Sequence, residues 1–320
     1  MEKPQTVAAR QGSSVVSQVA LKMGNELEFM APENGFLGLS GVDAFSAEQA
    51  KAWILPFGLE ESVSYGGGTA LGPQAILDAS HQVELFDEVF WSEPFRNYGV
   101  ATLCQPQIAA SLPRVMEDLD RHVQTILDHG KFPLVLGGEH SLTAGTIRPF
   151  SRAYEQITIL QFDAHADLRD GYEDEPYSHA AAMCRCLDHD NVRLVSVGIR
   201  NISAGEVPFL EANRDRISIF WAKDKNRWTA QQVAEAVGKG PVYVSVDLDG
   251  FDSSLMAATG TPEPGGLFWQ DVMDVLEAVA AQAQIVGADV VELAPRPELH
   301  ACDFLSAKLV YKILNYSLAR

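Results

Sequence analysis

Short apolar runs alternate with helix-like segments through most of this chain, and this alternation constrains the fold more than any other feature. The apolar runs are rich in β-branched residues and are typical of buried strands. The helical segments between them allow consecutive strands to lie parallel, with helices covering both faces of the sheet. We therefore expect a mostly parallel α/β fold. The predicted strands lie at 52–57, 133–136, 157–163, 193–198, 217–221, 242–248 and 285–293, and the predicted helices at 73–85, 112–129, 141–155, 229–238, 268–283 and 302–318.

The expected domain organisation is simple. No linker rich in Pro, Gly and Ser divides the chain, so we predict a single catalytic domain at residues 36–320. Residues 1–35 are polar and irregular and are predicted to form an N-terminal arm. The chain has 320 residues, of which 47% are hydrophobic, and this is enough to bury a large α/β core.

The net charge restricts the possible partners. The formal net charge of −19 repels phosphate backbones and anionic lipids, so we expect neither nucleic acid nor a membrane as partner. The charge would attract cationic small molecules, although a high net charge also simply keeps a protein in solution. The four cysteines are too few and too scattered for a disulfide framework, and neither a run of about 20 apolar residues nor a secretory signal pattern is visible. These features predict a cytoplasmic protein.

One predicted strand runs directly into the sequence Asp-Ala-His-Ala-Asp at residues 163–167. Successive side chains of an extended chain point to opposite sides, so Asp163, His165 and Asp167 can converge on one point. Two carboxylates and an imidazole have no apolar reason to follow a core strand. The pattern therefore indicates metal ligands.

Three other predicted strands also end in residues with acid–base or metal-binding chemistry. His140 follows one strand after a pair of glycines, and Glu292 ends another. Asp247 and Asp249 follow the third strand, two residues apart. Taken singly, these residues could be a helix-start histidine, a surface carboxylate and a turn or calcium-like loop. Because ligands of such sheets bind beyond the carboxyl ends of the strands, we expect all of them at one rim.

Together these residues predict a metal centre. Carboxylates with a minority of imidazoles suit Mn²⁺ and, less specifically, Fe²⁺, Co²⁺, Ni²⁺ or Zn²⁺. Six candidate ligands are too many for one catalytic zinc ion and suit two ions that share bridging carboxylates, an arrangement that activates water near neutral pH. The candidate ligands are His140, Asp163, His165, Asp167, Asp247 and Asp249.

The predicted site residues fall in three sequence blocks: Gly-Gly-Glu-His-Ser at 137–141, the Asp-Ala-His-Ala-Asp sequence at 163–167, and Ser-Val-Asp-Leu-Asp at 245–249 with Asp252. These blocks resemble those of the ureohydrolase family, which includes arginases and agmatinases. The likeness continues in Thr-Gly-Thr-Pro-Glu-Pro-Gly-Gly at 259–266. Within this family the chain is most similar to agmatinases.

The resemblance implies a fold and a cofactor. It implies a three-layer α/β/α sandwich around an eight-stranded, mostly parallel sheet, as in arginases. It also implies two Mn²⁺ ions per subunit, with Ni²⁺, Co²⁺ or another divalent ion as alternatives, and a homotrimer or homohexamer. Carried over to this chain, Asp163 and Asp247 would bridge the two ions. His140 and Asp167 would complete the ligands of one ion, and His165 and Asp249 those of the other.

The resemblance also implies two catalytic residues. His179 matches the family's catalytic histidine and would carry a proton to the leaving amine. Glu292 matches the carboxylate that holds the substrate guanidinium. Two positions depart from the family pattern: Ala180 stands where many relatives have glycine, and Ser253 where they usually have proline. Neither change removes a reactive group, so urea and an amine are the expected products.

The loop at 169–176, which leads to His179, suggests which guanidino compound is cleaved. It carries four carboxylates and one arginine. A site for arginine must bind an α-carboxylate, and this loop has the wrong charge for that, whereas an amine tail would be attracted. The carboxylates could also be merely solvated. We predict a small cationic guanidino substrate, agmatine, which is cleaved to putrescine and urea.

Other interpretations stay open. The same metal site would suit a guanidinobutyrase, a guanidinopropionase, an arginase or a formiminoglutamase. A catalytically inactive subunit that binds metal is an interpretation of another class, and the presence of all the predicted ligands and both catalytic residues argues against it. A dinuclear phosphoesterase would also use Asp and His ligands, but the motifs and the negative charge argue against a phosphate substrate.

Overall fold

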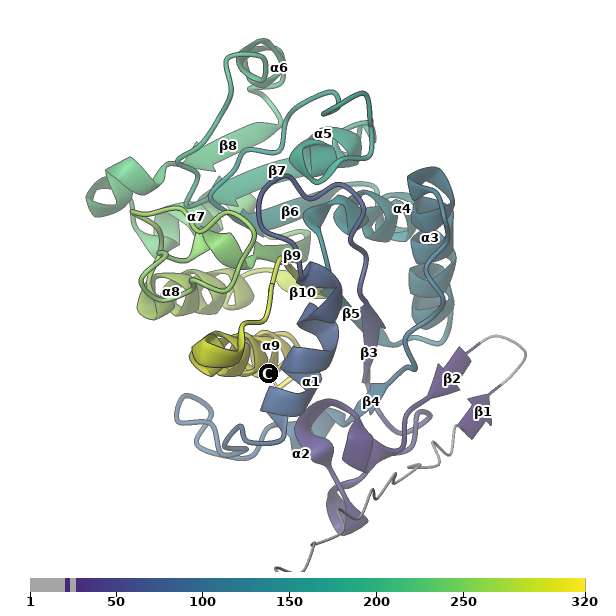
Figure 1. Ribbon diagram of the computed structural model, residues 1–320. Helices are drawn as coiled ribbons and strands as arrows, with labels where there is room; N and C mark the ends of the chain where they lie inside the picture. The colour runs from purple at the N-terminus through teal and green to yellow at the C-terminus, as the bar shows by residue number, and fades with distance from the viewer. Residues whose placement is uncertain (1–20, 24–26, 320) are drawn as a thin grey trace, which may run out of the picture.

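The centre of the protein is a sheet of eight strands, all parallel, in the order β4-β3-β5-β10-β9-β6-β7-β8 (Figure 1). This is a computed structural model, and it describes residues 21–23 and 27–319. The strands are β3 (Ala52–Phe57), β4 (Val100–Thr102), β5 (Phe132–Gly137), β6 (Ile157–Phe162), β7 (Val192–Val197), β8 (Ile217–Phe220), β9 (Pro241–Asp247) and β10 (Gln284–Val291).

Helices cover both faces of this sheet and make it the middle layer of three (Figure 1). The predicted α/β/α sandwich is therefore confirmed. No helix in the described part of the chain is long and apolar enough to cross a membrane. One face carries α1 (Gly72–Ser80), α7 (Ala230–Val237), α8 (Trp269–Ala280) and α9 (His300–Leu318), and the other α3 (Leu112–Asp128), α4 (Thr143–Ala153) and α5 (Ala182–Cys186); α2 (Phe95–Tyr98) and α6 (Val207–Ala212) are short.

The sheet has a hydrophobic core on each face because its central strands are apolar on both sides. In β9, Val242, Val244 and Val246 pack into the core beneath α7, α8 and α9. The alternate residue Tyr243 points to the opposite core, where its ring meets that of Phe150 from α4 at a centroid distance of 5.0 Å. This alternation follows from the two-residue period of a strand.

The structure differs from the predicted elements mainly at their ends. β4 was not predicted, since Val100–Thr102 is too short to form a recognisable apolar run. Predicted strands at 242–248 and 285–293 end earlier, at Asp247 and Val291. The first stops because Leu248–Gly250 turns into a 3₁₀ helix, and the second because Glu292 has a φ of 67°, which an extended strand does not allow.

Part of the predicted N-terminal arm is described. Strands β1 (Leu21–Met23) and β2 (Leu27–Phe29) pair antiparallel. Phe29 is buried and its ring meets that of Trp53 edge to face at 4.8 Å. The rest of the predicted arm before Leu27 lies outside the described residues, and the boundary at residue 36 stays a prediction.

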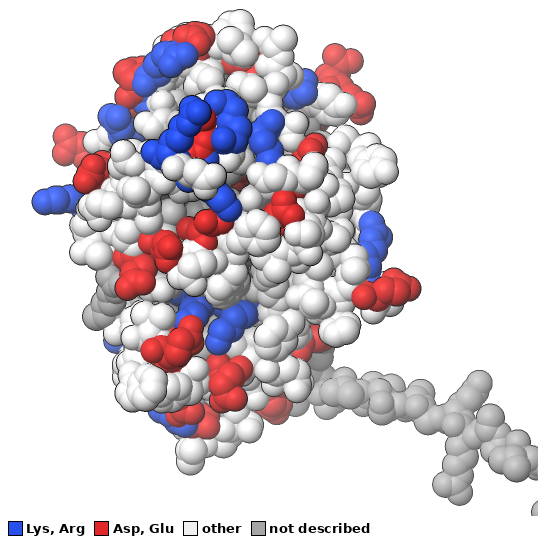
Figure 2. Space-filling view, turned by 90° about the vertical axis from the view of Figure 1, so that its left-hand side faces the viewer, with Lys and Arg blue, Asp and Glu red and all other residues white. Residues whose placement is uncertain are grey.

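The charged side chains on the face shown in Figure 2 are of both signs and lie interspersed. Ion pairs also link neighbouring elements: Lys225 Nζ lies 2.6 Å from Asp271 Oδ2, and Arg152 and Asp120 form a second pair between α4 and α3. On this face, the excess of acidic residues is therefore not concentrated in a single acidic patch.

Candidate metal centre and active site

The candidate ligands and Glu292 lie at or just after the ends of the four central strands of the sheet, β5, β10, β9 and β6. The strand register places Leu136, Val290, Val246 and Phe162 side by side in one row. The residues that follow this row therefore leave the sheet at the same level. The late strands β9 and β10 return between β5 and β6, and crevices form where the strand order reverses in this way.

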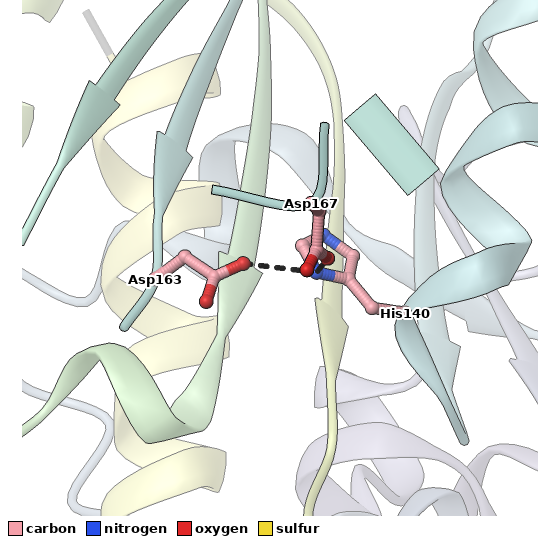
Figure 3. A group of neighbouring side chains, drawn as sticks. All are labelled: His140, Asp163 and Asp167. Atoms are coloured by element: carbon pink, nitrogen blue, oxygen red, sulfur yellow. Dashed lines mark ion pairs between the residues drawn. The ribbon is translucent and has the colours of Figure 1, made fainter. Parts of the chain in front are cut away.

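The first group of candidate ligands gathers around the imidazole of His140 (Figure 3). Its Nδ1 lies 3.1 Å from Asp163 Oδ2, 3.0 Å from Asp167 Oδ2 and 3.4 Å from Asp247 Oδ2. All four side chains are buried, yet Nδ1 has no hydrogen-bond partner among the described residues. A buried nitrogen without a partner requires an explanation, and a metal ion among the three carboxylates provides one.

The second group gathers around His165. Its Nδ1 lies 3.0 Å from Asp249 Oδ2 and 3.7 Å from Asp163 Oδ1. Asp163 thus faces His140 with one carboxylate oxygen and His165 with the other, as a bridging ligand would. Asp247 contacts His140 and accepts the main-chain N–H of Asp249 at 2.9 Å, so its predicted bridging role stays a prediction.

The electrostatics of the cluster favour a cation. Burial raises the pKa of Asp163 to about 7, and the charges of Asp167 and Asp249 add to this effect. Burial would lower the pKa of His165, but the hydrogen bond and the charge of Asp249 raise it to about 11. Protons and divalent cations relieve the same repulsion among buried carboxylates. The donor set and its charge therefore fit a pair of divalent metal ions.

A series of hydrogen-bonded polar groups contacts the other ring nitrogen of His140. This series was not predicted from the sequence. His140 Nε2 lies 2.9 Å from Ser245 Oγ, which donates a 2.7 Å hydrogen bond to Asp289 Oδ1. Asp289 is fully buried and also accepts the hydroxyls of Tyr243 and Thr143. An aspartate within the apolar strand β10 was the available signal for this network. Such partners fix the orientation of a metal-binding imidazole.

Backbone geometry at two site residues is strained. Asp167 has a φ of 51° and Glu292 a φ of 67°, in the left-handed region that side chains other than glycine rarely adopt. The carboxylate of Glu292 is held in place, since its Oε1 accepts the main-chain N–H of His140 at 2.7 Å. Such strain costs on the order of 1–3 kcal/mol per residue and is concentrated at functional sites.

The predicted catalytic residues line the same cavity as five of the six candidate ligands, all except the fully buried Asp163. The cavity has a volume of about 340 Å³, and both His179 and Glu292 form part of its wall. His179 begins the 3₁₀ helix His179–Ala181, and its ring meets that of Tyr172 edge to face at 6.2 Å. Burial raises the pKa of Glu292 to about 8. The structure thus brings all eight predicted site residues to one place.

The four carboxylates of the loop at 169–176 do not face the cavity, although the charge of the loop led us to expect that they would. Its residues Arg169 and Tyr172 line the cavity, whereas its four carboxylates do not. Asp170 instead pairs with Arg185 at 2.6 Å. The acidic side chains in the cavity wall beyond the ligands and Glu292 are Glu206 and Glu263. The carboxylates of this loop are therefore not placed to contact an amine tail in the cavity.

Two further residues hold the surrounding loops through backbone atoms. Arg200 Nη2 donates to the carbonyl oxygens of Asp249 at 2.7 Å and Glu263 at 2.8 Å. Asp252 Oδ2 accepts the main-chain N–H of Gly265 at 2.7 Å. These contacts connect the loop after β9, which carries Asp249 and Asp252, to the segment at 259–266.

The fold and the cluster of carboxylates and imidazoles define a three-layer α/β protein with a candidate metal centre. Residues 50–315 match the model of the Arginase family. The chain belongs to this family, whose members are hydrolases that act on guanidino compounds.

The curated relatives include two N(1)-aminopropylagmatine ureohydrolases. The protein from Synechocystis is 31% identical over 299 residues, which cover 90% of this chain and 95% of the relative. The protein from Thermus thermophilus is 35% identical over 275 residues, 84% of this chain and 90% of the relative. Among solved structures, the agmatine ureohydrolase of Thermoplasma volcanium is 28% identical, with a TM-score of 0.77 over 87% of this chain and 94% of that one.

Proposed function

We propose that this protein cleaves agmatine to putrescine and urea, with two divalent metal ions held by His140, Asp163, His165, Asp167, Asp247 and Asp249. The observation that carries the proposal is the position of Asp163, whose two oxygens face the two ligand histidines. Glu292 and His179 line the cavity that opens onto this cluster. Manganese is the expected metal.

The bound ions would supply Lewis-acid activation of water. Glu292 binds the cationic guanidinium through charge-assisted hydrogen bonds and orients its carbon toward the cluster. His179 gives a proton to the nitrogen that leaves as the amine. The burial of Glu292 beside the cavity would strengthen its interaction with the guanidinium.

The cavity wall contains two carboxylates, those of Glu263 and Glu206, whose charge suits an ammonium group at the tail of the substrate. Glu263 lines the wall, and among the described contacts its carboxylate has only His165 Nε2 near it, at 3.9 Å. Glu206 is buried and its carboxylate accepts the main-chain N–H groups of Leu168 and Ser203. Arg169 is the one cationic side chain other than histidine in the described wall. Glu263 is therefore the better candidate for an ammonium group.

A longer amine is the second candidate substrate. Both curated relatives described above are N(1)-aminopropylagmatine ureohydrolases, and one of them covers nine-tenths of this chain. N(1)-aminopropylagmatine has a guanidinium at one end and an additional secondary amine. The same wall carboxylates favour either compound over a guanidino acid.

The test is urea release from a panel of substrates after separate reconstitution with Mn²⁺, Ni²⁺, Co²⁺ and Zn²⁺. The panel contains agmatine, N(1)-aminopropylagmatine, arginine, guanidinobutyrate and guanidinopropionate. We expect the two amines to be cleaved with the highest kcat/KM. Faster cleavage of a compound with a carboxylate tail would overturn the proposed specificity, and no urea from any compound would favour an inactive metal-binding subunit.

Assembly and location complete the proposal. A homotrimer or homohexamer and a cytoplasmic site of action are the expectations carried by the family resemblance and the sequence. Sedimentation of the metal-loaded protein measures the first of these directly.

A further inference from the structure

The side chain of Ser62 lies between His179 and a buried carboxylate. Ser62 Oγ is 3.2 Å from His179 Nδ1 and donates a 2.9 Å hydrogen bond to Glu139 Oε1. It also accepts the main-chain N–H of His179 at 2.9 Å. One hydroxyl therefore connects the imidazole of the cavity to an acidic side chain that follows strand β5.

Glu139 determines the direction of the Ser62 hydroxyl. Glu139 is fully buried, and its Oε2 accepts the main-chain N–H groups of Glu61 and Ser62, both at 2.7 Å. Its Oε1 accepts the hydroxyls of Ser62 at 2.9 Å and Ser141 at 2.6 Å. A serine hydroxyl has a single proton to donate. Because Ser62 uses that proton toward Glu139, its oxygen can only accept from His179.

The direction of this hydroxyl fixes the tautomer of His179. A neutral imidazole carries its proton on one of its two nitrogens. Since Ser62 Oγ only accepts, the 3.2 Å contact requires the proton on Nδ1. Nε2 is then the nitrogen with a free lone pair, and it has no hydrogen-bond partner among residues 27–319.

We propose that Ser62, oriented by Glu139, is a positioning residue that keeps His179 in the Nδ1–H tautomer. Nε2 is then the atom that takes up a proton and gives it to the leaving amine, while Nδ1–H stays bonded to Ser62. The use of this arrangement in the reaction rests on the proposed function. The tautomer of His179 is inferred from the hydrogen bonds alone and does not depend on the proposed function.

A second hydroxyl near His179 provides the rival explanation. Ser178 Oγ lies 3.4 Å from His179 Nδ1, and its proton is not committed to an acceptor among the described residues. A hydrogen bond from Ser178 would leave the proton on Nε2. Nδ1 and Ser62 Oγ would then face each other as two acceptors at 3.2 Å, which is unfavourable. The shorter contact with Ser62 therefore decides the tautomer.

The tautomer can be measured by ¹⁵N NMR of protein with labelled histidine, loaded with diamagnetic Zn²⁺. Signals of His179 are those that disappear in His179→Asn. We expect a protonated Nδ1 and an unprotonated Nε2 in the natural protein, in Ser62→Thr and in Ser178→Ala, and a mixture of tautomers in Ser62→Ala. A proton on Nε2 in the natural protein, or a change in Ser178→Ala but not in Ser62→Ala, would overturn the proposal.

Kinetics with the best substrate of the panel give the second measurement. General acid–base catalysis contributes about 10²–10⁴-fold to a rate, and loss of orientation removes part of it, so we expect kcat of Ser62→Ala to fall about tenfold. KM should change by less than about twofold, and Ser62→Thr should restore most of kcat. An unchanged kcat in Ser62→Ala contradicts the positioning role of Ser62 in the reaction. If no substrate is cleaved, the proposed function fails, and the NMR measurement still decides the tautomer.

Discussion

The main-chain N–H of His140 donates a 2.7 Å hydrogen bond to Glu292 Oε1, although 152 residues separate the two in the chain. Strands β5 and β10, which these residues follow, are neighbours in the sheet. The bond holds the carboxylate of Glu292 at the cavity wall beside the candidate metal ligands. It thus connects the proposed substrate-binding group to a proposed ligand through the backbone.

The first prediction separates the charge of Glu292 from this structural bond. Glu292→Gln retains an oxygen that can accept from His140 N but loses the charge that pairs with a guanidinium. We expect kcat/KM to fall about 10- to 100-fold, since a hydrogen bond to a charged group contributes about 1.5–3 kcal/mol. The metal content and the Tm should match those of the natural protein. A lost metal ion in this variant would show that Glu292 acts on the cluster instead.

The second prediction concerns His179. His179→Ala removes the proton carrier without touching a ligand, so turnover should fall by about 100-fold or more. Metal analysis should still find both ions bound. An empty site in this variant would contradict the role assigned to His179.

Much of this site was predictable because several of its residues have a local sequence signal. His140, Asp163, Asp247 and Glu292 each follow an apolar run, and a parallel sheet brings such strand ends together whatever their distance along the chain. The order of the strands had no comparable signal, since it depends on how the long connections pack. Local sequence therefore predicted which residues meet, and the structure added the contacts between them.

The residues that orient the site were not predictable in this way. The contact between Ser62 and Glu139 spans 77 residues, and Ser62 lies in a polar loop with no pattern of its own. The acidic loop at 169–176 had a clear pattern, but charge along a sequence does not determine which way a loop faces. Its carboxylates lie outside the cavity wall, whereas Glu263, a single acid in a glycine- and proline-rich segment, lies in it.

The third prediction tests the support behind His140. Asp289→Asn weakens the acceptor that holds Ser245, and Ser245 in turn contacts His140 Nε2. Loss of such a supporting group typically costs about 10- to 100-fold in metal affinity, and we expect a decrease in that range by calorimetric titration. Asp274→Asn, on the exposed side of α8, is the matched control and should bind metal normally. An equal affinity in both variants would remove this role from Asp289.

The fourth prediction distinguishes the two acidic segments near the cavity. Glu263→Gln removes a charge from the wall and should raise KM for agmatine about three- to tenfold, since a partly exposed ion pair contributes about 1 kcal/mol. Asp174→Asn removes a charge from the loop at 169–176, whose carboxylates do not line the cavity, and should leave the KM for agmatine unchanged. The reverse result would restore the acidic-loop hypothesis.

The last prediction concerns a buried ion pair whose residues do not line the cavity. Lys312 Nζ lies 2.9 Å from Asp87 Oδ1, and both side chains are almost completely buried. Asn315 Nδ2 donates to the other oxygen of Asp87 at 2.7 Å. Lys312→Met would leave the carboxylate of Asp87 buried without its cation. Removal of one partner of a buried ion pair lowers the free energy of unfolding by about 3–5 kcal/mol.

The double variant Asp87→Asn with Lys312→Met is the control, because it removes both charges and should recover part of that loss. Burial would raise the pKa of Asp87, but the hydrogen bonds from Lys312, Val89 and Asn315 outweigh it and lower the pKa below its ordinary value. The stabilisation is therefore fully present above the unfolded pKa of about 4 and is lost as the pH falls through the lower folded value. Urea unfolding between about pH 6 and pH 3 should show this loss in the natural protein and a smaller one in the double variant. Equal pH dependence in the two proteins would mean that other carboxylates govern acid unfolding.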